Sequence, residues 1–440
     1  MSALSFAFWN FAAPPVDAAA RWNELWNAAP DATPIGRWEH ILNWLDHRSA
    51  RKRATALVVE QEGRLVAALP LRTDRVCRFV PAWRAMAEAW AWAGDLLVDA
   101  NTPDQDAIHD CLVRGLGTLR RPWVWFDAIA LEETVWRDFV AACGRAGLAT
   151  VERPHFECGR IAIHGADAAA DWNGYETGRS RNQRQQIRKA QSSRGHLGGV
   201  VLETHRPSDP DAVASLLVRG FAVEDKSWKG PAGTSVLRTA GALEFYLDQA
   251  AQLAHDGELE LTFLRHGDVN IAFEYGWRSK SVYYTPKIGY DEAFAHLSPS
   301  QLLRGLKLEE LFADPTCYTL DFCGPLAEAT AKWATSERLY SGLIVGIGLL
   351  GNTLLHAAET YGPGIRATLR EIRDLLIRPK TTEPQTSQAA PASKTDAIAN
   401  KTNSRNNEAV TTQVDDVHSP AALDAHRAGQ GCMEAFSGIV

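Results

Sequence analysis

The stretch 258–322 constrains the fold most, because three alternating runs in it are followed by a helix start and a fourth run. Apolar and polar residues alternate in 259–263 and again in 269–277, which predicts two half-buried strands joined by a tight turn. A third run, 282–288, contains Pro286, which lacks the N–H group that a strand ladder needs. The sequence therefore predicts a third strand that is bulged or unpaired at Pro286.

A helix is expected directly after this strand. Ser298 is placed to cap it, Pro299 occupies the first helical position, and Gln301 follows the serine by three residues, which together match a capping box. The helix is predicted to run to about Ala313, and a fourth strand, 317–322, closes the unit.

The start of this helix is a candidate anion site. The first amides of a helix are unpaired and carry about half a positive charge, which favours a phosphate. The caps Ser298 and Gln301 use only part of these amides. Ser300 lies at the approach and Arg304 one turn in, so we expect these four residues to bind a phosphate-bearing cosubstrate beside the strand broken at Pro286.

Composition excludes several classes of protein. The net charge of −7 argues against a general nucleic-acid binder. Seven cysteines without a CxxC pair predict reduced thiols in a cytoplasmic protein and no zinc or other metal site. No run reaches the roughly 18 apolar residues of a membrane span, and no Lys or Arg precedes Arg21, so neither a span nor a secretory signal is expected.

The order of predicted elements occurs twice, which indicates two α/β units in tandem. We expect a first domain over 1–160, a second over 161–345, and two helices in 346–379. Residues 380–440 are rich in Thr, Ser, Ala, Asn, Gln and Pro and should form a disordered tail. The other predicted elements are helices at 15–48, 104–119, 132–146, 209–224, 240–255 and 330–337, and strands at 54–59, 65–71, 76–80, 92–98, 123–129, 148–152 and 339–345.

A basic cluster lies at the start of the second unit, with no acid from 177 to 202. Its members are Arg179, Arg181, Arg184, Arg188, Lys189 and Arg194. Arg181, Arg184 and Arg188 fall on one helical face, so they form a candidate site for an anionic part of a substrate. The alternative is a solvated helix face whose arginines pair with acids elsewhere.

Two further stretches carry candidate catalytic groups. Glu224 ends an apolar helix, and Trp228 and Lys229 follow it, so this loop either binds a substrate or only ends the helix with an anchoring Trp. Glu274 lies in mid-strand and is a general base only if it reaches the substrate; otherwise it lies on a solvated sheet face. Tyr290 beside the bulged strand is a candidate general acid, although such tyrosines also serve packing.

The glycines Gly346, Gly348 and Gly351 match the G-x-G-x-x-G dinucleotide motif, after a strand and before a helix. The motif also needs a second parallel strand carrying an acid, and Glu371, at the required distance, lies in a predicted helix. A dinucleotide site is therefore disfavoured. The sequence contains no HExxH, GxSxG or P-loop motif.

Residues 179–340 resemble the CelD/BcsL branch of the GNAT superfamily, also described as BioF2-like acetyltransferases, and the architecture resembles the tandem-GNAT FemAB proteins. The residues that carry the resemblance are Ser180 to Gly195, Glu224 with Ser227 to Gly230, Ile271-Ala272, Tyr290-Asp291, Leu297 to Pro299 with Leu302-Leu303, Asp321-Phe322 with Gly324, and Lys332-Trp333. Ser300 stands where the family commonly has Gly, and the general signature Q/R-x-x-G-x-G/A is absent.

The resemblance implies two GNAT-like units, of which the first is structural and the second is an N-acetyltransferase. It implies transfer of an acyl group, acetyl in the first instance, from acyl-CoA to an amine or hydroxyl of a small or carbohydrate-linked acceptor. A carboxylate, Glu224, Glu274 or Asp321, would take the proton. The alternatives are an aminoacyl-tRNA-dependent transferase like the FemAB proteins and a non-catalytic binding protein of the same fold.

Overall fold

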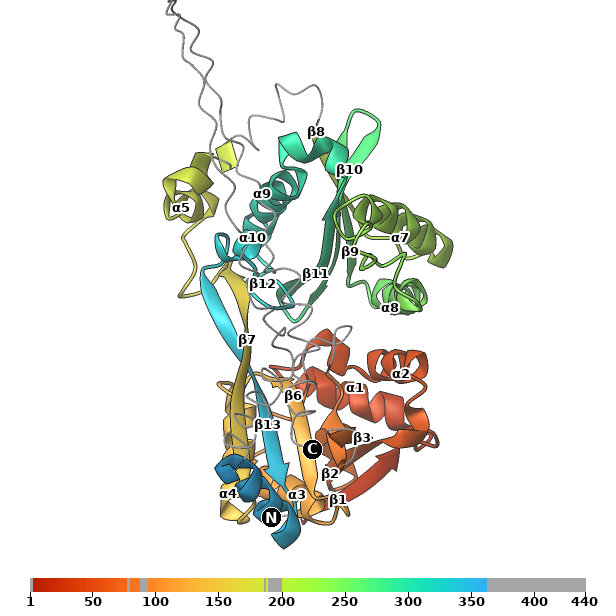
Figure 1. The fold of residues 1–440 in the computed structure, drawn as a ribbon, viewed down its shortest axis with the longest axis vertical. Coiled ribbons are helices and arrows are strands. Elements are labelled where there is room, and N and C mark those ends of the chain that lie inside the picture. The colour runs from red at the N-terminus through yellow and green to blue at the C-terminus, as the bar shows by residue number, and fades with distance from the viewer. Residues whose placement is uncertain (1–2, 77–79, 88–93, 186, 189–199, 362–440) are drawn as a thin grey trace, which may run out of the picture. The chain divides into compact units, whose positions relative to one another are not determined.

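The computed structural model describes residues 3–76, 80–87, 94–185, 187–188 and 200–361. Residues 1–360 form one compact unit. Its strands belong to a single mixed sheet with the order β1-β2-β3-β4-β6-β13-β7-β12-β11-β10-β9-β8, and β5 pairs with β3 outside this path. Figure 1 shows helices on both faces of this sheet. The predicted tail, 380–440, and most of the predicted helical segment 346–379 lie outside the described residues.

The first half of the chain supplies one end of the sheet. Its elements are β1 (Leu4–Asn10), α1 (Ala18–Ala28), α2 (Trp38–His47), β2 (Ala54–Gln61), β3 (Arg64–Val76), β4 (Val80–Ala85), β5 (Leu97–Val98), α3 (Gln105–Gly117), β6 (Trp123–Ile129), α4 (Thr134–Arg145) and β7 (Thr150–Ala162), with two short 3₁₀ turns, Pro34–Gly36 and Arg51–Arg53. The predicted strand 76–80 is wrong as one element, because β3 ends at Val76 and β4 pairs back on it from Val80. β1 was not predicted.

The second half repeats the order of helices and strands, as predicted. Its elements are α5 (Trp172–Thr177), β8 (Val200–His205), α7 (Pro210–Asp225), α8 (Ala242–His255), β9 (Leu259–His266), β10 (Val269–Ser279), β11 (Val282–Tyr290), η3 (Glu292–Leu297), α9 (Pro299–Phe312), β12 (Thr319–Asp321), α10 (Glu328–Ala331) and β13 (Ser336–Gly346). A further helix covers 348–361. The predicted helix 330–337 is mostly wrong, because α10 ends at Ala331 and β13 begins at Ser336.

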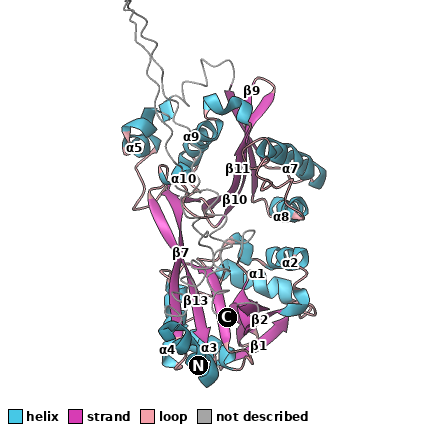
Figure 2. Ribbon diagram, in the orientation of Figure 1, coloured by secondary structure: helices cyan, strands magenta, loops and turns pink. Residues whose placement is uncertain are grey.

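Alternation in β10 sorts its side chains onto the two faces of the sheet. Phe273, Tyr275 and Trp277 are buried in the same apolar cluster as side chains of α7 and α8. Ile271 and Ala272 belong to a cluster with Leu302, Leu303 and Leu306 of α9. Figure 2 shows α7 and α8 on one side of β9 to β11 and α9 on the other. The predicted amphipathic pattern therefore buries both faces of this part of the sheet.

The two halves are joined by long strands. β13 pairs with β7 from Ser336 opposite Arg160 to Val345 opposite Thr150, and its other edge pairs with β6. β7 then continues to pair with β12. The predicted strand 148–152 is thus the beginning of the much longer β7, which crosses the predicted domain boundary at 160. The boundaries themselves stay predictions.

Candidate active site

β11 leaves its neighbour β12 soon after it begins. The two strands pair in parallel only from Val282 opposite Thr319 to Tyr284 opposite Asp321. The ladder between β11 and β10 slips opposite Thr285 and Pro286, between Tyr275 and Trp277. The predicted disruption of the third strand at Pro286 is therefore confirmed, and we call the region beyond Tyr284 the parting of β11 and β12.

The free edge of β11 presents backbone groups toward the parting. The amide of Asp291 donates to the carbonyl of Ile271 at 2.9 Å, which makes Asp291 a hydrogen-bonded position of the ladder with β10. Because such positions alternate along an antiparallel strand, the N–H and C=O groups of Ile288 and Tyr290 point away from β10. The carbonyl of Ile288 accepts a hydrogen bond from Lys229 Nζ at 2.8 Å. Lys229, predicted to bind substrate, thus lies on this free edge.

The start of α9 is not a capping box, and that prediction is wrong. Ser298 has φ of +53° and its side chain makes no capping hydrogen bond. The amides of Gln301 and Leu302 both donate to the Ser298 carbonyl. The Gln301 side chain instead accepts from Trp333 Nε1 at 2.9 Å. The first turn of α9 carries no acid, and Ser300 is half-buried there.

The corresponding helix of the first half, α3, begins differently. Asp104 has φ of +65°, the same left-handed backbone as Ser298. Its carboxylate accepts from the amide of Ala107 at 3.1 Å, and Asp106 adds a second acid in the first turn. An anion at the start of α3 would therefore meet two carboxylates, whereas none stands in the first turn of α9.

Glu274 and Arg304 meet between β10 and α9. Arg304 Nη2 lies 2.5 Å from Glu274 Oε2, and the hydroxyls of Tyr283 and Thr285 donate to the same carboxylate at 2.7 and 2.9 Å. Both charged side chains are buried. Burial and the nearby Glu274 raise the pKa of Tyr283 well above its usual range, which keeps its hydroxyl a donor. Arg304 is directed at the sheet, so its role toward a phosphate stays a prediction.

Glu224 lies at the end of α7 on the other face of the sheet. Its carboxylate accepts from Lys229 Nζ at 2.9 Å and from the amide of Val236 at 3.0 Å. Burial lowers the pKa of Lys229, and the Glu224 charge opposes this effect. A Cβ on Gly289 would lie 2.5 Å from Glu224 Cα, so α7 ends against the free part of β11. Trp228 is exposed beside this group.

The other two predicted catalytic residues lie apart from each other. Asp321 at the end of β12 is buried, where it accepts from the amide of Cys323 at 2.8 Å and lies 3.4 Å from Arg160 Nε. Tyr290 is half-buried at the end of β11, and its hydroxyl is 3.5 Å from Glu292 Oε1. Burial raises the pKa of Tyr290, so it stays protonated as an acid would have to be.

The described arginines of the basic cluster differ in their partners and in their exposure to solvent. Arg184 donates to the carbonyls of Thr177 and Arg179, and Arg188 lies 3.2 Å from Glu176. Arg179 itself donates to the Ala334 carbonyl, and Arg181 is exposed. Lys189 and Arg194 lie outside the described residues.

The glycine motif at 346–351 serves packing in the structure. A Cβ on Gly351 would lie 2.1 Å from the Pro122 carbonyl, and one on Gly346 would lie 2.7 Å from the Asn352 side chain. Gly348 has φ of +64°. β13 is antiparallel to both neighbours, so the strand arrangement of a dinucleotide fold is not formed around this motif.

Lys287 was missed by the sequence reasoning. It follows Pro286 at the parting, is half-buried, and its Nζ lies 5.5 Å from the centre of the Tyr246 ring on α8. Burial lowers the pKa of its ammonium, and the Glu224 charge opposes this. A lysine directly after a strand-breaking proline was the available signal.

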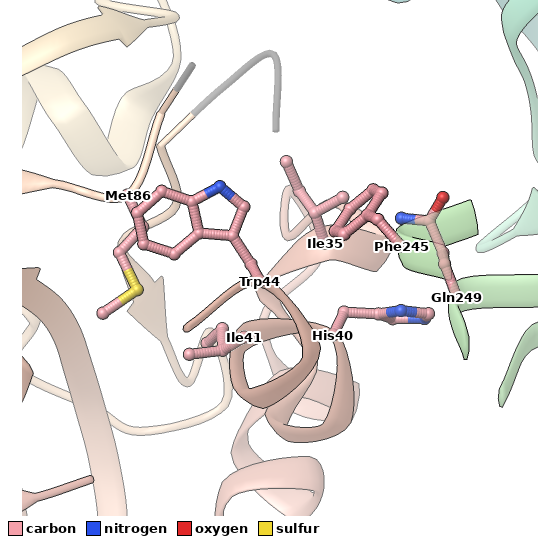
Figure 3. Close-up of a pocket in the computed structure, with 7 residues that line it drawn as sticks. All are labelled: Ile35, His40, Ile41, Trp44, Met86, Phe245 and Gln249. Atoms are coloured by element: carbon pink, nitrogen blue, oxygen red, sulfur yellow. The ribbon is translucent and has the colours of Figure 1, made fainter. Parts of the chain in front are cut away.

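Two pockets lie elsewhere. Figure 3 shows one of about 20 Å³, room for a water molecule, where His40 and Trp44 of α2 face Phe245 and Gln249 of α8. The other, of about 190 Å³, is lined by residues of the first half such as His109. Neither contains a predicted site residue. Across the described residues, no group of three or more His, Cys, Asp or Glu is arranged to hold a metal ion, and no helix is long and apolar enough to span a bilayer.

Comparison with known proteins identifies part of the chain. Residues 181–331 match the family model described as an acetyltransferase (GNAT) domain. The fold is similar to that of FemX, with 11% identity, a TM-score of 0.53, and coverage of 77% of this chain and 97% of that one. A tandem GNAT protein from the clavulanic acid biosynthesis pathway aligns with 13% identity, a TM-score of 0.41, and coverage of 78% and 98%. No curated protein matches the sequence.

Proposed function

We propose that the chain transfers an acetyl or related acyl group from acyl-CoA to an amine or hydroxyl of a small or carbohydrate-linked acceptor, because residues 181–331 match the acetyltransferase (GNAT) domain. The observation that carries the proposal is the presence of two features together: β11 has an unpaired edge beyond Tyr284, and the first turn of α9 contains no acidic residue. The CelD/BcsL-like specialisation rests on the sequence resemblance alone.

The pyrophosphate of acyl-CoA would bind at the start of α9. The Ser300 amide and hydroxyl are the donors closest to an incoming phosphate, because the amides of Gln301 and Leu302 already donate to Ser298. The acyl arm would lie along the N–H and C=O groups that Ile288 and Tyr290 turn toward the parting. The thioester supplies the activated carbonyl, and a backbone N–H of β11 would stabilise the developing oxyanion.

Two of the predicted catalytic residues lie beside the free part of β11. We propose that Glu224 accepts the proton of the attacking acceptor, since α7 ends against Gly289. Tyr290, whose pKa is raised, would donate a proton to the departing thiolate. Glu274 is paired with Arg304 on the α9 side of the sheet, the face opposite to Glu224, and Asp321 lies beside Arg160 where β12 still pairs with β11, so we give them a positioning role.

We propose that the first half binds no acyl-CoA. The carboxylates of Asp104 and Asp106 at the start of α3 would repel a phosphate at the equivalent place. The fold similarity to FemX keeps aminoacyl transfer as the second candidate. Against it, Arg184 of the basic face donates to the carbonyls of Thr177 and Arg179 within the chain, so the face is only partly available to RNA.

A thermal-shift panel separates the candidates. The full chain is mixed with acetyl-CoA, longer acyl-CoAs, CoA alone, or charged and uncharged tRNA, and thiol release is followed in parallel. We expect protection by acetyl-CoA and slow thiol release without acceptor. Protection by aminoacyl-tRNA alone would support the second candidate, and protection by none of them would reject an acyl-transfer role for this site.

A further inference from the structure

Lys287 is directed at the acceptor side of the sheet. It pairs with Tyr275 across β10 and β11, and side chains of paired residues share a face. That face packs against α8, where the Tyr275 and Tyr246 rings lie 5.5 Å apart. The ammonium of Lys287 therefore lies on the side opposite α9, where an acceptor would approach the parting while acyl-CoA occupies the α9 side.

Lys287 has no counter-ion in the described part of the chain. Its ammonium makes no hydrogen bond or ion pair there, and the Tyr246 ring is the group it faces. The one carboxylate that acts on it, Glu224, has its two oxygens engaged by Lys229 and by the amide of Val236. Lys229 in turn donates to Ile288.

The positive charge of Lys287 therefore has no counter-charge in direct contact among the described residues. Glu224 acts on both Lys229 and Lys287, but Lys229 holds one of its oxygens and the Val236 amide holds the other. Tyr246, which the ammonium faces, stays protonated because burial raises its pKa. A half-buried ammonium without a partner is unfavourable, so a bound species that brings one negative charge would be stabilised here.

We propose that the acceptor is an amine that carries a carboxylate, and that Lys287 binds this carboxylate and so determines acceptor specificity. This inference rests on the proposed function. A single ammonium without a counter-ion in contact matches a carboxylate better than a doubly charged phosphate, which would call for further donors. The carboxylate on Lys287 would direct the acceptor nitrogen toward the parting.

The transfer itself leaves Lys287 unchanged. The acceptor nitrogen forms a bond to the thioester carbon, the C–S bond breaks, and the amine loses one proton while the CoA thiolate gains one. The products are the N-acyl amine, which keeps its carboxylate, and free CoA thiol. Lys287 contributes by positioning the acceptor, so its removal should raise the acceptor KM and leave the acyl-CoA KM unchanged.

The test compares matched acceptors that differ only in charge. Binding of the common α-amino acids, ω-amino acids, their amides, and phosphoethanolamine to the full chain is measured by calorimetry, and thiol release is measured with acetyl-CoA. The proteins are wild type, Lys287→Met, Lys287→Gln, Lys287→Arg, and Lys52→Gln as an exposed-lysine control. Two neutral variants are used so that a folding defect in one does not obscure the result.

We expect at least one carboxylate acceptor to bind wild type roughly 10- to 100-fold more tightly than its amide, the range of a charge-assisted contact. Lys287→Met and Lys287→Gln should bring this ratio close to one, Lys287→Arg should retain most of it, and Lys52→Gln should leave it unchanged. A wild-type protein that binds no carboxylate better than its amide, or that prefers phosphoethanolamine, overturns the inference. Carboxylate binding without acetyl-CoA protection would instead reject the proposed function alone.

Discussion

Glu274 on β10 and Arg304 on α9 form a buried ion pair in which Arg304 Nη2 lies 2.5 Å from Glu274 Oε2. The sequence reasoning gave these residues separate tasks, one as a base and one as a phosphate ligand. The hydroxyls of Tyr283 and Thr285 complete the partners of the carboxylate. The pair therefore ties the helix that presents the candidate anion site to the strand beside β11.

Removing one member of this pair should destabilise the fold. Arg304→Met would leave the buried Glu274 charge with two hydroxyl donors, and we expect a loss of about 3–5 kcal/mol in the free energy of unfolding. Adding Glu274→Gln should recover part of this loss, since no buried charge then remains. Urea unfolding of both single variants and the double variant gives the coupling free energy between the two residues. Strictly additive losses in the free energy of unfolding would show that the two residues do not interact.

Acid should destabilise the contact between α2 and α8 through His40. Neither ring nitrogen of this buried residue has a hydrogen-bond partner among the described residues, and burial lowers its pKa from 6.5 to about 4. Between these values the unfolded chain binds the proton and the folded chain does not, so stability falls by up to about 3 kcal/mol as pH drops from 6.5 to 4.

Two acids oppose this effect in the same range. Burial raises the pKa of Asp95 and of Glu258 to about 6, so these two carboxyl groups increase the free energy of unfolding as pH falls. The comparison of wild type with His40→Leu isolates the histidine. The variant should lose the destabilising slope between pH 6.5 and 4; identical slopes in urea unfolding would contradict the assignment.

A negative charge at the start of α9 should abolish acyl-CoA binding. Ser300→Glu would set a carboxylate where the pyrophosphate is expected, while the folded chain should gain slightly, because acids are favourable in a first helical turn. The measurement is acetyl-CoA protection in a thermal-shift assay. Leu349→Glu, at the exposed start of the helix 348–361, is the matched control for the glycine motif. Full protection of Ser300→Glu would exclude α9 as the site.

Two arginines of the basic face should differ in their effect on stability, because one is hydrogen-bonded within the chain and the other is exposed. Arg184→Gln removes a side chain that donates to the carbonyls of Thr177 and Arg179, so we expect a loss of about 1–3 kcal/mol in stability. Arg181→Gln alters an exposed side chain and should leave the melting temperature unchanged. If Arg181 contacts an anionic ligand, only its variant raises the ligand's Kd at constant stability.

Local patterns predicted much of the second half. The alternation of Phe273, Tyr275 and Trp277 gave β10, and Pro286 gave the disruption of β11, because both signals act within a few residues. The capping box failed because the Gln301 side chain accepts from Trp333 Nε1, 32 positions along the chain, and residue types at the helix start do not reveal that contact.

Contacts between distant segments could not be predicted. Glu274 and Arg304 are thirty positions apart, and Lys229 reaches the carbonyl of Ile288 from a different loop. These partners are set by how α7 and α9 pack on the sheet, and no spacing in the sequence encodes that packing. The extra length of β7 has the same origin, because its partners β13 and β12 come much later in the chain.

The position of β13 also affects how the chain can fold during its synthesis. β6 and β7 are neighbours in the sheet only through β13, which belongs to residues 336–346. While a ribosome is still synthesising the second half, the strands of the first half therefore lack the one that joins them. The first half can complete its sheet only after residue 346 has emerged, so it should stay incomplete until the second half has been synthesised.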